Sequence, residues 1–336
     1  MTWVRLLLTL AFALPASTRL GDDVSLALNV RSVPFDPTNP SRRHLGSLRY
    51  RGGLVLRSGD PRFGGLSDLR VLENGRRLVA VSDCGTAFLA GLTYDERGDL
   101  RGLDDARLRP LMAPGGRPLT EGEEDAESLA LAPDDAFVVG FERRHRLWRY
   151  SPGRDPFSLP PEPLPIPPAS VNLEPNQGFE AALFLADARL VLLSEANTGP
   201  ETASGWVGND RAWDAFSFPL FYLDDAPREP FRPTALAALP GGDVLVLERR
   251  YPPLAVRVRR LPGTAFGRTW DLAGTELARL APPLTVDNFE GLDVAPGPDG
   301  ELRLFLISDD NDCAKGGHRH GTSDQRTLLL SFSMFD

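Results

Sequence analysis

The feature that most constrains this chain is a block of sequence that recurs five times. In each block a small or acidic residue precedes an apolar run, and a turn containing Gly, Asp, Asn or Pro leads to a second apolar run that ends on an acid. The blocks occupy residues 64–85, 124–144, 178–197, 232–251 and 288–311. Two apolar runs joined by a short turn are typical of a β-hairpin. The sequence therefore predicts five related hairpins.

The spacing of the closing acids indicates the length of the repeat. These residues are Asp83, Glu142, Glu195, Glu248 and Asp309, and successive members lie 59, 53, 53 and 61 residues apart. A period of this length is typical of propeller blades, in which two further strands complete a four-stranded sheet. A pair of β-sandwiches fits it poorly. We therefore expect an all-β protein with a β-propeller fold.

The two chain ends supply strands that the five blocks leave over. Residues 44–58, with the sequence HLGSLRYRGGLVLRS, indicate two short strands around Gly52 and Gly53. We expect them to pair with the hairpin at residues 289–308 and with the final strand at 327–332, because such closure removes exposed sheet edges. The sequence thus predicts a six-bladed propeller closed by pairing of N- and C-terminal strands in one blade. Five and seven blades are the alternatives.

Composition excludes some classes of partner. The chain has 336 residues with 37 Lys and Arg against 46 Asp and Glu, which gives a net charge of −9. Nucleic-acid binders and polybasic membrane binders need a positive potential. We therefore expect no nucleic-acid partner. We also expect a monomer, and the arginines described below predict a small anionic substrate.

The first residues have the pattern of an export signal. Arg5 precedes an apolar run at residues 6–14, and the small residues Ala13, Ala16 and Ser17 follow. The run is shorter than the ~20 residues that span a bilayer, so no stable membrane anchor is expected. A buried N-terminal strand is the alternative. The sequence predicts a protein exported to the periplasm or secreted, with these divisions: signal peptide 1–18, lead-in 19–42 and a single propeller domain 43–336.

The repeat also predicts where charged side chains meet. In a hairpin, the start of the first strand and the end of the second lie at the same end. The inner hairpin of each blade borders the central channel, so Glu127, Glu180 and Glu290 should join the closing acids at one channel mouth. Four arginines follow the closing acids and should lie among them: Arg143, Arg144, Arg249 and Arg250.

Such a rim predicts calcium and an anionic substrate. Clustered carboxylates repel unless a cation neutralises them, and calcium prefers six to eight oxygen ligands. Arginine binds phosphate or carboxylate through paired donors, and a metal with arginines is suited to phosphoester hydrolysis. Blade-to-blade salt bridges are the alternative. The expected calcium ligands are Asp83, Glu142, Glu195, Glu248, Asp309 and Asp310. The expected catalytic residues are Glu127, Glu180, Glu290, Arg143 and Arg249.

Other polar residues allow two interpretations each. Residues 309–312 are a second cation site or a turn rich in Asp and Asn. His318 and His320 face a metal or belong to a solvated loop, and His145 is a general base only if it faces the channel. Cys84 and Cys313, the only cysteines, form one bridge between the first and last blocks or remain separate thiols. No G-x-S-x-G elbow, P-loop or dinucleotide fingerprint is present.

Seven motifs in these blocks carry a family resemblance. They are GGLSDL, VSDCG, DAESLAL, NQGFEAALF, VLVLERRY, NFEGLDV and LISDDN. In this order they resemble the phytase-like family, also called esterase-like activity of phytase, over about residues 46–335. The resemblance implies a β-propeller and a calcium-dependent phosphoester or ester hydrolase.

The match differs from block to block. The family's E-G-L motif is present at Glu290-Gly291-Leu292 and, with Ser for Gly, at Glu127-Ser128-Leu129. It changes to Glu180-Ala181-Ala182 in the third block, and Thr234 replaces the acid in the fourth. After SDDN the family continues with a Phe- and Gln-rich stretch, where this chain has Asp312-Cys313 and GGHRH. The last block therefore departs from the family where a metal site would be expected.

Two further functions fit the same fold. A calcium-dependent sugar-lactone hydrolase would use Glu and Asn ligands in the channel, for which Glu180, Asn197 and Asn311 are available. A non-enzymatic propeller would present its surface to a protein or glycan. The fold does not decide between these functions, because propellers host all of them.

Overall fold

The computed structural model describes residues 23–153, 155–223, 226–267, 270–312, 314–315, 318–319 and 325–334. Within these ranges the chain is almost entirely strand, and two short 3₁₀ segments, η1 (Pro114–Gly116) and η2 (Pro168–Asn172), are the helical elements. No helix in the described ranges is long and apolar enough to cross a membrane. The predicted signal peptide lies outside the described residues.

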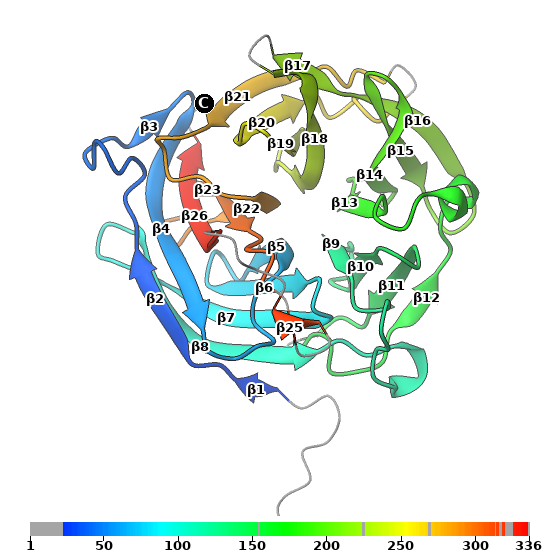
Figure 1. Cartoon of the computed structure of the whole chain (residues 1–336), viewed down its shortest axis with the longest axis horizontal. Helices are drawn as coiled ribbons and strands as arrows, with labels where there is room; N and C mark the ends of the chain where they lie inside the picture. Colours follow the sequence, from blue (N-terminus) through cyan, green and yellow to red (C-terminus); the bar gives the residue numbers. More distant parts are fainter. Residues whose placement is uncertain are drawn as a thin grey trace, which may run out of the picture.

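Five antiparallel sheets surround a central axis (Figure 1). From the axis outward, blade 1 contains β5 (Leu66–Leu72), β6 (Arg77–Ser82), β7 (Thr86–Tyr94), β8 (Leu100–Pro110) and β1 (Val24–Ser25). Blade 2 contains β9 (Ala126–Leu131), β10 (Phe137–Phe141), β11 (Arg146–Tyr150) and β12 (Glu162–Leu164). Blade 3 contains β13 (Phe179–Phe184), β14 (Leu190–Gly199), β15 (Thr202–Gly208) and β16 (Trp213–Pro219).

The remaining two blades have extra strands. Blade 4 contains β18 (Ala226–Ala238), β19 (Val244–Arg250), β20 (Ala255–Leu261) and β21 (Thr275–Leu280), with β17 (Phe221–Leu223) paired to β18. Blade 5 contains β22 (Phe289–Pro296), β23 (Leu302–Ser308), β26 (Thr327–Met334), β4 (Leu48–Ser58) and β2 (Leu28–Ser32), with β3 (His44–Leu45) paired to β4. A separate two-stranded ladder joins β24 (Ala314–Lys315) and β25 (His318–Arg319).

The inner strands close the ring. β5 contacts β9, β9 contacts β13, β13 contacts β18, β18 contacts β22, and β22 returns to β5. In blade 5 the last strand, β26, pairs with β4 on one side and β23 on the other, so the red strand β26 lies beside the blue strand β4 in Figure 1. The predicted propeller and its closure by both chain ends are confirmed.

The prediction of six blades is wrong, and the structure has five. The hairpin assigned to a sixth blade, β22–β23, is the inner hairpin of the fifth sequence block itself. The N-terminal strands therefore complete that blade instead of forming another. Two short strands from the segment assigned to the lead-in, β1 and β2, add outer strands to blades 1 and 5.

The core lies between neighbouring blades. In β19, Leu245 and Leu247 pack against blade 5, whereas Val244 and Val246 pack against blade 3. Side chains of a strand point alternately to opposite faces, so a strand buried on both faces is apolar at every position. This arrangement explains the uninterrupted Val-Leu-Val-Leu run at residues 244–247.

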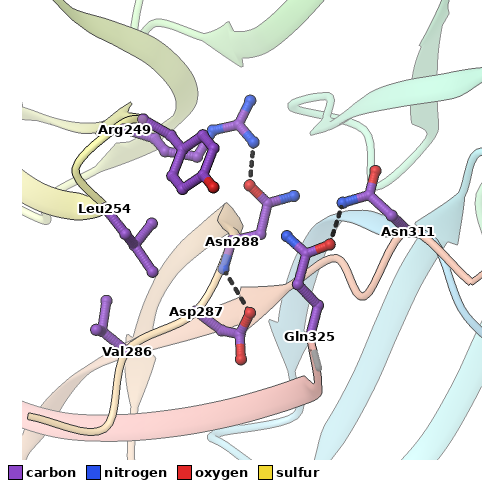
Figure 2. Close-up of a pocket in the computed structure, with 8 residues that line it drawn as sticks. Arg249, Leu254, Val286, Asp287, Asn288, Asn311 and Gln325 are labelled. Carbon is purple, nitrogen blue, oxygen red and sulfur yellow. Dashed lines mark hydrogen bonds between the residues drawn. The ribbon is translucent and has the colours of Figure 1, made fainter. Parts of the chain in front are cut away.

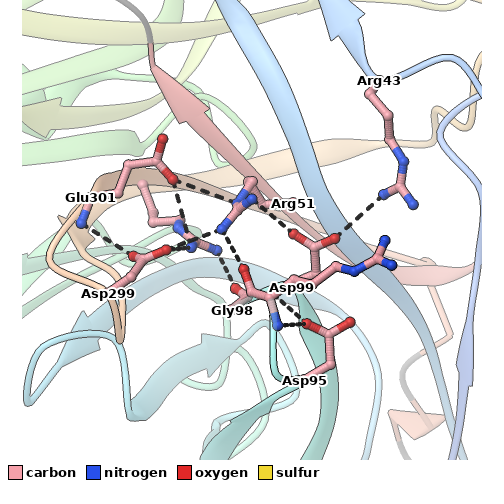
Figure 3. Close-up of polar contacts among 9 residues, drawn as sticks. Arg43, Arg51, Asp95, Gly98, Asp99, Asp299 and Glu301 are labelled. Atoms are coloured by element: carbon pink, nitrogen blue, oxygen red, sulfur yellow. Dashed lines mark hydrogen bonds and ion pairs between the residues drawn. The ribbon is translucent and has the colours of Figure 1, made fainter.

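Ion pairs join blades 1 and 5 where the ring closes (Figure 3). Arg51 of β4 pairs with Asp99, at the β7–β8 turn of blade 1, at 3.2 Å and with Asp299 at 3.0 Å. Arg303 of β23 is fully buried, pairs with Asp299 at 2.6 Å and donates to the carbonyl oxygen of Gly98 at 2.6 Å. Charge-assisted hydrogen bonds therefore help to close the ring, in addition to the strand pairing within blade 5.

A buried ion pair on β5 is hydrogen-bonded to the inner strands of other blades. Asp68 and Arg70 both lie on β5, with a separation of 3.2 Å. Asp68 accepts from the amide of Leu129 in blade 2 at 2.9 Å, while Arg70 donates to the carbonyls of Ala182 in blade 3 and Leu292 in blade 5, each at 3.1 Å. One pair from blade 1 thus binds the main chain of three other blades.

We predict that Arg70→Met strongly destabilises the ring. Burial raises the pKa of Asp68 to about 7, although Arg70 and backbone amides oppose the rise. Removing the arginine takes away the cation that faces this buried carboxylate and the donor to the carbonyls of Ala182 and Leu292, which costs about 3–5 kcal/mol. Urea unfolding measures the loss. The half-exposed pair of Arg260 with Asp243 supplies the control, because Arg260→Met should cost less than about 1 kcal/mol. Equal losses would contradict the assignment.

Candidate active site

Each inner hairpin contains a β-bulge at the same place. The register shifts by one residue near the start of the first strand, so that one residue of that strand has no partner on the second. A bulge redirects a side chain and is common beside functional sites. The five bulge residues, in chain order, are Ser67, Glu127, Glu180, Thr234 and Glu290.

A second set of residues follows from the same register. In each hairpin, one residue of the second strand pairs with the first-strand residue that directly precedes the bulge. In chain order these second-strand residues are Ser82, Phe141, Ser194, Glu248 and Ser308. The next residue along the chain lies at the end of the hairpin nearest the channel mouth, although in blade 4 Arg249 still pairs with Arg232. These hairpin-end residues are Asp83, Glu142, Glu195, Arg249 and Asp309. Four blades therefore present an acid at this position and blade 4 presents an arginine.

The position of Glu248 corrects the sequence alignment by one residue. Glu248 was aligned with the other closing acids, but it occupies the preceding position, and a shift by one residue turns a strand side chain to the opposite face. Glu248 is fully buried within blade 4, where Arg257 and Arg259 each bind its carboxylate at 2.6–2.7 Å. It is not brought to the channel mouth.

All of the bulge and hairpin-end residues except Thr234 line one cavity of about 270 Å³, here called the acidic cup. Nine predicted site residues meet in it, together with Ser67, Asp125, Asn176 and Asn311. The nine are Asp83, Glu127, Glu142, Arg143, Glu180, Glu195, Arg249, Glu290 and Asp309.

Besides Glu248, three predicted rim residues lie outside the cup. Asp310 accepts from the amide of Gly65 at 3.0 Å and from Thr327 at 2.7 Å, which ties the end of β23 to blade 1 and β26. Arg144 is exposed and lies 3.6 Å from Glu123. Arg250 is buried over the ring of Phe231 at 5.1 Å.

Of the predicted histidine and cysteine candidates, the structure describes the side chains of His145 and Cys84. His145 is not among the cup residues that the structure describes; its Nε2 lies 3.1 Å from the carbonyl oxygen of Glu174. Cys84 forms a disulfide, and the only other cysteine of the sequence, Cys313, lies outside the described residues. His320 and the side chain of His318 also lie outside them.

Burial and mutual repulsion hold protons on the cup acids. Burial raises the pKa of Glu127 well above its ordinary value, and repulsion from Glu142 and Asp83 adds to the rise. The pKa of Asp309 is raised in the same way, by burial and then by Glu290 and Asp83. Asp83 is thus a common neighbour of these acids. Without a cation, part of the cup's carboxyl groups is neutral near pH 7.

Glu142 and Glu180 form a carboxyl pair. The two side chains share a hydrogen bond, which requires a proton on one of them. Glu142 also accepts from the amide of Gly178 at 2.6 Å. Burial, repulsion from Glu195 and the bond to Glu142 raise the pKa of Glu180 well above its ordinary value. We therefore place the proton on Glu180.

Glu290 faces a cation. Arg249 Nη1 lies 3.1 Å from Glu290 Oε1, and Asn288 Nδ2 donates to the same oxygen at 2.9 Å. Burial nevertheless raises the pKa of Glu290 to about 7, because it outweighs the attraction of Arg249. Only 15% of the Glu290 side chain is exposed. This carboxyl can give or accept a proton near neutral pH.

A glycine permits the close approach of Asp83. Gly65 has φ of +57°, and a Cβ at this position would lie 1.7 Å from Asp83 Oδ1. A larger side chain would therefore push the carboxylate out of the cup.

Sequence reasoning missed three cup residues. Ser67 occupies the bulge position of the first block, so a register-based alignment would have found it. Asp125 precedes Glu127 by two residues and pairs with Arg143. Asn176 lies in the loop before β13 and carries no repeat signal.

A family model described as "Phytase-like: Esterase-like activity of phytase" matches residues 61–312, which include every bulge residue and hairpin-end residue. No curated protein matches the chain.

Solved structures show distant likenesses. A protein of unknown function from Dyadobacter fermentans is 13% identical with a TM-score of 0.43, covering 95% of this chain and 99% of that chain. The WD40 repeats of RRP9 are 10% identical with a TM-score of 0.42, covering 86% and 100%. Virginiamycin B lyase from Staphylococcus aureus is 11% identical with a TM-score of 0.40, covering 92% and 100%. Likenesses this distant carry no argument about function.

The cup predicts an unusual pH dependence of stability. Acids with raised folded pKa values bind more protons in the folded state than in the unfolded state, starting near the unfolded value of about 4.3. The stability they contribute is complete below that pH and is lost as pH rises through the folded values, about 7 for Glu290. In chelator, the unfolding temperature should therefore be lower at about pH 8 than at about pH 5.

Two variants test the origin of this slope. The double variant Glu127→Gln, Glu180→Gln should flatten it, because amides do not titrate. Glu73→Gln, at the exposed β5–β6 turn, should leave it unchanged. A chelated wild-type protein that becomes more stable from about pH 5 to about pH 8 would contradict the description of the cup.

Proposed function

Because the chain belongs to the phytase-like family (esterase-like activity of phytase), we propose that it is a hydrolase that cleaves phosphoesters at the acidic cup. The proposal rests on three features that meet in one cavity. They are the Glu142–Glu180 pair, which shares one proton, the carboxyl of Glu290, which has a pKa of about 7, and two arginines. Hydrolysis of an ester needs a group that takes a proton from water and a group that gives one to the leaving alcohol.

The arginines suit the anionic part of the substrate. Arg249 extends from the end of β19 between Glu195 at 3.6 Å and Glu290 at 3.1 Å. Arg143 pairs with Asp125 and is half exposed, so it can turn toward a ligand. Guanidinium groups bind phosphoryl oxygens through paired donors. We assign both arginines to substrate binding.

The acids then supply the proton transfers. Glu290, in its ionised form, takes a proton from a water molecule, whose oxygen attacks the phosphorus. The bond from phosphorus to the ester oxygen breaks, and the proton on Glu180 passes to the departing alcohol. This leaves Glu180 ionised and Glu290 protonated. One proton must therefore pass from Glu290 to Glu180 before the next cycle. A pKa near pH 7 favours both directions of transfer at Glu290.

The side chains that line the cup carry the kind of ligand atoms that calcium prefers. The cup offers carboxylate and amide oxygens, which are hard ligands that calcium prefers. In the ranges that the structure describes, no three His, Cys, Asp or Glu side chains already converge as a metal site. Asp83, Glu127, Glu290 and Asp309, which repel one another, would hold the ion. When bound, it would neutralise this repulsion and polarise the phosphoryl group.

The disulfide supports export. Disulfides persist in oxidising compartments and are rare in the cytosol, and Cys84 forms one. We therefore propose that the protein acts outside the cytoplasm, as the N-terminal sequence predicts.

The lactone-hydrolase alternative has less support. Glu180 and Asn311 line the cup, but Asn197 Oδ1 accepts from Arg232 at 2.9 Å and is not among its described lining residues. The two arginines of the cup favour an anionic substrate over a neutral lactone.

We predict that Glu290→Gln and Glu180→Gln each lower kcat for 4-nitrophenyl phosphate about 10²–10⁴-fold, because each removes a proton transfer. The assay contains calcium and is repeated with 4-nitrophenyl acetate to separate phosphoester from carboxylic-ester cleavage. Arg144→Gln, at an exposed position outside the cup, is the control and should retain activity. A wild-type protein that hydrolyses neither ester would overturn the proposed function.

We predict that calcium binding releases protons. Calorimetric titration at about pH 7 in two buffers of different ionisation enthalpy should show net release, since bound carboxyls must lose their protons. Glu127→Gln and Asp309→Asn should each weaken affinity about tenfold or more. Glu248→Gln should lower stability without changing affinity, because Glu248 is bound by arginines away from the cup. Binding that depends on Glu248 and not on Asp309 would contradict this assignment.

A further inference from the structure

A second cavity of about 600 Å³ adjoins the acidic cup (Figure 2). Arg249 and Asn311 line both cavities. Between them, Asn288 donates to Glu290 of the cup at 2.9 Å and accepts from Arg249. The remaining lining residues of the second cavity are Tyr251, Leu254, Val286, Asp287 and Gln325. A ligand held by Arg249 therefore has space on both sides of that side chain.

The polar groups of the second cavity are largely bonded to the protein. Asn311 Nδ2 donates to Gln325 Oε1 at 2.9 Å. Asp287 accepts from Arg326 at 3.0 Å and from the amide of Asn288 at 3.1 Å. A ligand that enters thus meets few polar groups in need of a partner, and Arg249 is the cation that borders both cavities among the described lining residues.

The other wall of this cavity is apolar. Val286 is buried, Leu254 is half-buried, and Tyr251 is 72% exposed. Of the three large hydrophobic side chains that are exposed in the described part of the chain, the other two being Leu159 and Val171, Tyr251 is the one that borders a described cavity. Exposed aromatic surface beside a cavity is typical of a ligand site.

We infer that the second cavity binds the uncharged organic part of the substrate, so that the preferred substrate is a phosphomonoester of an aromatic alcohol. This inference rests on the proposed function. The phosphoryl group contacts Arg249 at the cup, and the aromatic ring packs between Tyr251, Leu254 and Val286. A cavity of this volume is large enough for a two-ring group. A substrate with many phosphates gains nothing from such a wall.

Two probes that cannot be hydrolysed test the cavity without any assumption about catalysis. The first is 2-naphthylphosphonate and the second is methylphosphonate, in both of which carbon replaces the ester oxygen. Calorimetry with the full chain in calcium buffer measures both affinities. Burial of the naphthyl group should make the first probe bind at least about tenfold more tightly.

The variants locate the effect. Leu254→Trp fills the cavity and should reduce the ratio of the two affinities about tenfold. Tyr251→Ala alters a residue that is 72% exposed, so it should change stability little, and it should also reduce the ratio. Leu159→Trp, at an exposed position that lines neither cavity, should leave the ratio unchanged. Equal affinities in the wild type, absence of binding by both probes, or a ratio that neither cavity variant changes would overturn the inference.

The result is separable from the proposed function. If the wild type prefers naphthylphosphonate but hydrolyses no ester, the hydrolase proposal is wrong and the cavity assignment stands. If it hydrolyses phenyl phosphate and inositol hexakisphosphate with equal kcat/KM, and the variants do not change the affinity ratio, the cavity assignment is wrong and the hydrolase stands.

Discussion

The β-bulge at the start of each inner hairpin is the constraint on which the functional end of this propeller depends. A regular ladder would place the inner side chains alternately toward the neighbouring blades. The bulge inserts one unpaired residue, which turns Glu127, Glu180 and Glu290 toward the axis and sets which residue ends the hairpin. Because all five hairpins share the bulge, closure of the ring brings these side chains to one cavity.

Ring closure has an electrostatic cost at this cavity. Eight acids and two arginines line the cup among the residues that the structure describes, and burial raises the pKa values of four of the acids. The buried pair of Asp68 and Arg70 bonds the inner strands together below the level of the bulges. The ring can therefore hold repelling acids at its mouth, where protons neutralise part of them and the proposed cation would neutralise more.

The sequence was sufficient for features that depend on local pattern. Apolar runs with turns predict the five hairpins, and Glu127, Glu180 and Glu290 fall where hairpin geometry places them. Blade number was not predictable in this way, because the same hairpin, β22–β23, satisfied both the fifth block and the chain-end blade. Glu248 was misaligned because the register of a bulged hairpin is not visible in a count of residues. The pairing of Asp68 with Arg70 and the second cavity depend on contacts between distant blades.

We propose above all that the acidic cup is a cation site and not a set of structural ion pairs. An anomalous difference map from crystals grown with calcium at about pH 8, where fewer protons compete with the ion for the carboxylates, tests it most directly. The account predicts one peak inside the cup, within calcium-ligand distance of carboxylates from Asp83, Glu127, Glu290 or Asp309. A map with no peak in the cup, or with a peak only at Asp310 or Glu248, would contradict it.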